Sequence, residues 1–92
     1  MFCGGGNVSP EMQKFMDGVG KNGSIATEAG KFGYKKDEVP LEYYKLESPS
    51  VKSSGKKDGK TCYVMNAKHG MVDSDVNVCW DGAKIVSITD VE

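Results

Sequence analysis

Residues 60–91 read KTCYVMNAKHGMVDSDVNVCWDGAKIVSITDV, and this stretch decides the fold. It carries two of the three cysteines, the single tryptophan and two glycine turn signals between runs of alternating apolar and polar residues. A period of two residues is typical of β-strands. The sequence therefore predicts a strand on each side of Gly70, and a further strand after Gly82.

The turn between the first two strands fixes how they pair. A two-residue turn at Gly70-Met71 suits the mirror-image hairpin type that places glycine first. In this register Cys62 lies opposite Cys79 in a non-hydrogen-bonded pair, whose Cα atoms are about 4.5 Å apart. That distance is at the short end of the span that a disulfide accepts. The same register gathers four side chains on one face as a candidate core: Tyr63, Met65, Val76 and Val78.

Two alternatives to this disulfide remain open. A turn at His69-Gly70 would pair Cys62 with Asn77 and leave the cysteines as diagonal neighbours only. Two buried free thiols are the other alternative, because free cysteine is often buried. A disulfide would close a loop of 18 residues, which in the chain-entropy model is worth about 3 kcal/mol. It would also indicate that the protein is located outside the reducing cytosol.

Length and charge indicate one small domain without a nucleic-acid partner. The chain has 92 residues, of which 38% are hydrophobic, and a formal net charge of −1. A chain this short buries about 60–65% of its unfolded surface, so a covalent cross-link would matter. Near-neutral charge argues against nucleic-acid binding, which favours a strongly basic face. No apolar run approaches the ~20 residues of a membrane span.

The first eight residues, MFCGGGNV, predict a flexible leader, because they hold three successive glycines and no periodicity. Cysteine followed at once by glycines and asparagine resembles the mature start of bacterial lipoproteins, over residues 3–7. The resemblance implies that Cys3 carries a lipid and that the leader tethers residues 9–92 as a single α+β domain. Phe2 departs from the lipoprotein pattern, in which a small residue usually precedes the cysteine. A free thiol on Cys3 is the alternative.

Residues 9–33 predict helix that covers the sheet. Ser9 can cap the helix, with Pro10 at its first position. Glycines at 18, 20 and 23 predict either a break near residues 20–23 or a frayed end, and Ser24 can cap a second segment. The apolar side chains of the first segment recur at helical spacing and form one stripe: Met12, Phe15, Met16 and Val19.

Residues 41–54 read as an extended strand, which Pro49 restricts to a sheet edge or a bend. Residues 55–59, GKKDG, read as a turn whose lysines point into solvent. Trp80 is expected to cover the rim of the core with its indole N–H in water. On the last strand, over residues 83–91, either Ile85 or the pair Val86 and Ile88 faces the helix, depending on the loop length.

The fold expected from these elements is α+β: an N-terminal helix, either continuous or broken, packed on a three- or four-stranded antiparallel meander with a cross-strand disulfide. This order of elements is similar to small extracytoplasmic cystatin-like or nuclear-transport-factor-like domains. The similarity is topological and spans about 80 residues. It implies no particular activity, because such folds carry many functions.

The residues offer little catalytic or metal-binding chemistry. Asp73, Asp75 and Asn77 imitate the opening of a calcium loop, but Val78 and Lys84 stand where glycine and a bidentate glutamate are required. A solvated polar strand face is the better interpretation. With a single histidine, zinc spacing is lacking, and a Cys79–His69 nucleophile would need a reduced thiol. We therefore expect no catalytic residue, no metal, no cofactor and no enzyme.

Four residues are candidate binding residues, taken from the aromatic segment, the lysine turn and the hairpin tip: Tyr44, Lys56, Lys57 and His69. Two functions fit. The first is a non-enzymatic binding or structural module of the bacterial envelope, membrane-bound only through a lipid on Cys3. Its outer sheet face or concave surface would contact a protein partner, and it would be a monomer or weak dimer. The second is a secreted inhibitor or small-ligand carrier that uses the loops at residues 55–59 and 69–72.

Overall fold

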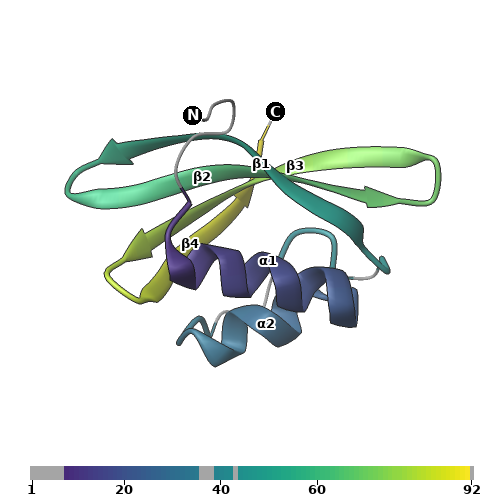
Figure 1. Cartoon of the computed structure of the whole chain (residues 1–92), viewed down its shortest axis with the longest axis horizontal. Coiled ribbons are helices and arrows are strands. Elements are labelled where there is room, and N and C mark those ends of the chain that lie inside the picture. Colours follow the sequence, from purple (N-terminus) through teal and green to yellow (C-terminus); the bar gives the residue numbers. More distant parts are fainter. Residues whose placement is uncertain (1–7, 36–38, 43, 92) are drawn as a thin grey trace.

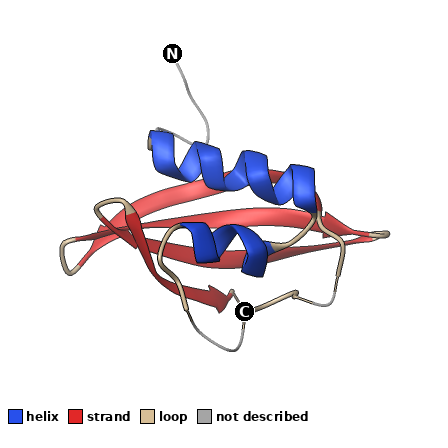
Figure 2. Ribbon diagram, turned by 90° about the horizontal axis from the view of Figure 1, so that it is seen from below, coloured by secondary structure: helices blue, strands red, loops and turns tan. Residues whose placement is uncertain are grey.

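The computed structural model describes residues 8–35, 39–42 and 44–91. Two helices, α1 (Pro10–Asn22) and α2 (Ile25–Lys31), precede four strands: β1 (Glu47–Lys57), β2 (Lys60–His69), β3 (Val72–Asp81) and β4 (Lys84–Asp90). The strands form one antiparallel sheet in sequence order. Both helices lie on one face of the sheet (Figures 1 and 2). We call the opposite face the outer face. The predicted α+β class is confirmed.

Both helices begin where the sequence predicts, and α2 ends at Lys31, two residues before the expected end at residue 33. Ser9 caps α1, because its Oγ accepts the N–H of Met12 at 3.1 Å. Gly23 ends α1 in the left-handed conformation, with φ of 75°, and the predicted break therefore falls there. Ser24 then caps α2. The predicted stripe is fully or nearly fully buried against the sheet: Met12, Phe15, Met16 and Val19. No helix among the described residues is long and apolar enough to span a membrane.

The central hairpin has the predicted register. Gly70 takes a φ of 65° at the first turn position, and His69 pairs with Val72 directly after the turn. Cys62 therefore lies opposite Cys79, and the two form a disulfide across Cα atoms 4.0 Å apart. Because side chains alternate along a strand, the disulfide lies on the outer face and the predicted core residues lie beneath the sheet. All four of these are buried: Tyr63, Met65, Val76 and Val78.

The prediction for β1 and its turn was wrong at both ends. The strand begins at Glu47 rather than at residue 41, because Leu41 takes a φ of 64° and accepts a turn hydrogen bond from Tyr44 N–H. It continues to Lys57, because the turn needs only Asp58 and Gly59, whose φ angles of 53° and 80° are those of a two-residue mirror-image turn. As predicted, β1 with its Pro49 is an edge strand.

Trp80 is buried in the core rather than placed at a wet rim. Its side chain continues the inward alternation of β3, and its ring packs edge-on against Phe15 and Phe32, at centroid distances of 6.2 and 5.1 Å. Its indole N–H donates to the sulfur of Met12 at 3.2 Å. The thioether therefore replaces the water that the sequence-based expectation assigned to this donor.

An irregularity in β4 explains which of its side chains enter the core. Trp80 pairs with Ile85 and Cys79 with Ser87, so Val86 is an extra residue between two consecutive pairs. This bulge places both Ile85 and Ile88 on the buried face and leaves Val86 half-buried. The sequence offered either Ile85 or the pair Val86 and Ile88, and neither alternative included the bulge.

Candidate functional site

The four predicted binding residues separate into two pairs at opposite ends of β2. Tyr44 stacks on His69, with ring centroids 4.2 Å apart and planes 25° from parallel. Lys56 and Lys57 lie at the end of β1, beside the β1–β2 turn. His69 ends β2 whereas that turn begins it, and a ten-residue strand is about 30 Å long. The four residues therefore form two separate surfaces, because the two ends of β2 lie on opposite sides of the molecule (Figure 1).

One surface is the tip of the β2–β3 hairpin, which we define as Tyr44, His69, Met71 and Val72. Met71 is fully exposed, and Tyr44 and Val72 are 52% and 56% exposed. These are three of the four large apolar side chains that are exposed in the described part of the chain, the fourth being Val91. Large apolar residues gathered at one exposed place are typical of a contact surface.

The aromatic part of the hairpin tip is held in place from below. His69 lies on the helix-facing side of β2, and its Nε2 is 3.1 Å from Ser74 Oγ on β3. Tyr44 is fixed by the turn hydrogen bond to Leu41 and covers the imidazole ring. The ring of Tyr44 is thus already oriented in the unbound chain, which lowers the entropy cost of using it in binding.

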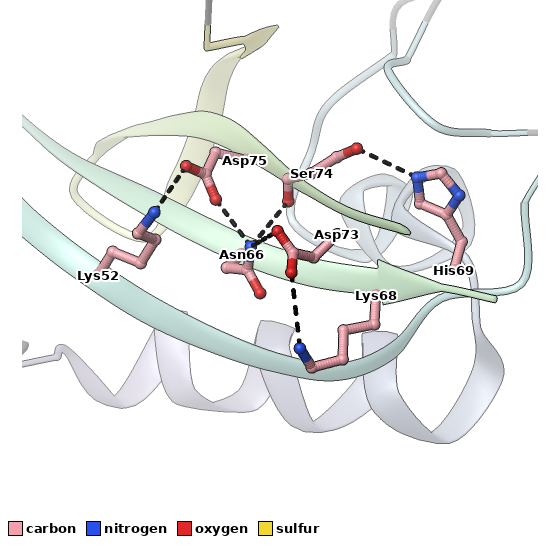
Figure 3. A network of polar contacts seen from close by, with 7 residues as sticks. All are labelled: Lys52, Asn66, Lys68, His69, Asp73, Ser74 and Asp75. Carbon is pink, nitrogen blue, oxygen red and sulfur yellow. Dashed lines mark hydrogen bonds and ion pairs between the residues drawn. The ribbon is translucent and has the colours of Figure 1, made fainter. Parts of the chain in front are cut away.

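The outer face carries a polar network around Asn66 (Figure 3). The Asn66 amide donates to Asp75 Oδ1 at 2.9 Å and lies at 3.4 Å from Asp73 Oδ1. Lys52 pairs with Asp75 at 2.9 Å and Lys68 with Asp73 at 3.7 Å. The hydrogen bond from Asn66, followed by the bond and charge of Lys52, lowers the pKa of Asp75 below its usual value, while partial burial opposes the shift.

This network uses the carboxylates that resembled a calcium loop. Asp75 and Asp73 are each paired with a lysine, and the amide of Asn77 donates instead to Cys79 Sγ at 3.4 Å. Within the described ranges, no group of three or more acidic, histidine or cysteine residues could hold a metal ion. The arrangement is thus the solvated polar face, with Lys68 opposite Asp73, that the sequence favours.

The predicted cysteine sites have different outcomes. Cys62 and Cys79 are bonded to each other, Cys62 half-buried and Cys79 nearly buried on the outer face. His69 lies on the other side of the sheet, so the structure does not bring it to Cys79 as a nucleophilic pair. Cys3, the expected lipid attachment site, lies outside the described residues, as does nearly all of the expected leader.

Sequence reasoning included Met71 and Val72 only as part of a loop. The signal was present, because a Gly-Met turn exposes an apolar side chain at a position where polar residues are usual. The Tyr44–His69 stack had no signal, since it depends on the turn in which Tyr44 N–H donates to Leu41 O.

Comparison of the chain with protein-family models, curated proteins and solved structures finds no match. Function is therefore inferred from this chain's own residues and their geometry.

Proposed function

We propose that this chain is a non-enzymatic binding or structural module of the bacterial envelope, which contacts a protein partner through the hairpin tip. The observation that carries the proposal is the gathering of three exposed side chains, Tyr44, Met71 and Val72, at the hairpin tip. They lie beside the imidazole ring of His69, which a hydrogen bond with Ser74 holds in place. Turn residues have no need of large apolar side chains for folding, and such exposed groups favour aggregation unless they are covered.

The disulfide supports the extracytoplasmic part of the proposal. Structural disulfides persist in oxidising compartments and are rare in the cytosol. Cys62–Cys79 joins the two central strands of the sheet, so its formation is linked to the fold itself. Acylation of Cys3 would then hold the domain at a membrane, as the resemblance of residues 3–7 to lipoproteins implies.

The alternative of a secreted inhibitor or small-ligand carrier has less support. It uses the loops at residues 55–59 and 69–72, which lie at opposite ends of β2 and therefore do not line one common binding site (Figure 1). The depression beside the hairpin tip, between Lys68 and Asp73, is shallow and open to solvent. This geometry favours a protein surface over an enclosed small molecule as the partner.

Site-specific photo-crosslinking in the native host tests the proposal. A photoreactive residue at Met71 should give one discrete protein adduct, and the same residue at Lys14, which is exposed on α1, should give none. Introducing Val72→Asp beside the photoreactive residue should abolish the adduct without changing the melting temperature, because Val72 is outside the core. Equal adducts from both positions, or none from Met71, would contradict the proposal.

A further inference from the structure

The second surface, at the other end of β2, has a strand edge that pairs with no other strand in the described part of the chain. Residues 53–57 of β1 pair with β2 in five consecutive steps, from Ser53–Val64 to Lys57–Lys60, without interruption. The register shifts and the proline of β1 all lie before this segment. Bulges, prolines and lysines are devices that prevent an edge strand from pairing with another chain. Residues 53–57, which we call the open edge, lack bulges and prolines and carry only the lysines, Lys56 and Lys57, which repel a basic strand but not an acidic one.

The pairing pattern shows which backbone groups of the open edge are free. Lys57 and Lys60 flank a two-residue turn, so they form a hydrogen-bonded pair. Alternation then makes Lys56 and Ser54 non-hydrogen-bonded positions toward β2, and their N–H and C=O groups point outward. Among the described residues no backbone hydrogen bond reaches these groups. On the other edge of the sheet, by contrast, Ile85 N–H in β4 donates to Phe32 O.

The side chains of this end are positively charged and unpaired. Lys56, Lys57 and Lys60 take part in none of the ion pairs formed within the described residues. Lys57 lies directly opposite Lys60, and like charges at such a position destabilise a sheet. The nearby carboxylates, Asp58 in the turn and Asp81 at the end of β3, form no ion pair with them. An added carboxylate would relieve this repulsion.

We propose that the open edge binds an extended, acidic segment of a partner protein as an added fifth strand. Ser54 and Lys56 offer two N–H donors and two C=O acceptors to the segment, and carboxylates on it would lie beside the lysines. A second copy of this chain fits less well, because pairing two open edges would place Lys56 and Lys57 of both copies at one interface, where their positive charges repel. This surface is independent of the hairpin tip.

The probe is a ten-residue peptide of alternating threonine and glutamate, with the matching threonine–lysine peptide as its control. In an NMR titration, the acidic peptide should shift and protect the amides of Ser54 and Lys56, whereas the lysine peptide should not. The double variant Lys56→Glu/Lys57→Glu should weaken binding at least about tenfold. The pair Lys14→Glu/Lys21→Glu, on the exposed side of α1, changes net charge equally and should leave binding unchanged.

Backbone pairing is tested separately. Ser54→Pro removes an outward N–H and should abolish binding, while Ser54→Ala should retain it. An acidic peptide N-methylated at alternate amides tests the same bonds without any change in the protein, and one of its two methylation patterns should lose binding. Shifts centred on β4 or the hairpin tip, equal binding of both peptides, no binding at millimolar peptide, or dimerisation of the free chain through β1 would each overturn the proposal.

Discussion

Single residues decide how closely the two helices pack. Glu28 is 4% exposed between them, and its Oε2 accepts from Asn22 Nδ2 and pairs with Lys31 Nζ at 2.9 Å. Space for this carboxylate exists because residue 18 is glycine: a Cβ there would lie 1.8 Å from Glu28 Oε1. From the sequence, Gly18 indicates a weak helix. In the structure, glycine is required there because the buried Glu28 side chain occupies the space that a Cβ would fill.

Gly18→Ala should therefore destabilise the chain by about 1–3 kcal/mol, as overpacking does, although alanine is the better helix former. The free energy of unfolding in urea measures the effect. Gly30→Ala in α2 is the matched control, because a Cβ there meets nothing within 4 Å. The control should be neutral or gain up to about 1 kcal/mol. If both variants changed the free energy of unfolding equally, the space at Gly18 would not be required for the packing of Glu28.

Asp75 makes a pH-dependent contribution to the stability of the folded chain. Its pKa is lowered in the folded state, first by Asn66 and then by Lys52, so the stabilisation is complete above its unfolded pKa and is lost as pH falls through the folded pKa. Asn66→Ala and Lys52→Met should each raise the pKa of Asp75 toward its ordinary value of about 3.9. NMR titration of the Asp75 carboxyl carbon measures both. An unchanged pKa in Asn66→Ala would disprove the network.

At the scale of elements, the sequence predicts most where two constraints coincide. The β2–β3 hairpin could be aligned because the Gly70 turn and the two cysteines require the same register. β1 was misplaced because the glycines at 55 and 59 suggested a five-residue turn, whereas Asp58-Gly59 alone closes it. The β4 bulge was unpredictable because one extra residue leaves the apolar composition unchanged and is decided by packing around Trp80.

The β2–β3 hairpin also sets the largest stability prediction. The double variant Cys62→Ser/Cys79→Ser should keep the fold but lose about 3 kcal/mol, which is the chain-entropy value for a loop of this length. Thermal unfolding with and without a reducing agent measures the loss. Reduction should lower the melting temperature of the natural chain and leave the double variant unchanged. A double variant as stable as the natural chain would mean that the disulfide does not stabilise the domain.

The whole molecule has helices on one face and two separate candidate contact surfaces at the ends of its sheet. The sequence suggested Tyr44, His69, Lys56 and Lys57 as binding residues. Their division into two surfaces follows from the length of β2 and from the turn in which Tyr44 N–H donates to Leu41 O. Neither feature is encoded in local periodicity.

The strand alignment and the proposed location both depend on a disulfide between Cys62 and Cys79 in the native host. The redox state of these two cysteines in native cells shows whether that disulfide forms. Cells are quenched with acid, free thiols are alkylated without reduction, and the peptides containing the two cysteines are analysed by mass spectrometry. The account predicts one disulfide-linked peptide pair with neither cysteine alkylated. Recovery of both cysteines as alkylated free thiols would contradict the cross-linked fold in the cell and the extracytoplasmic role together.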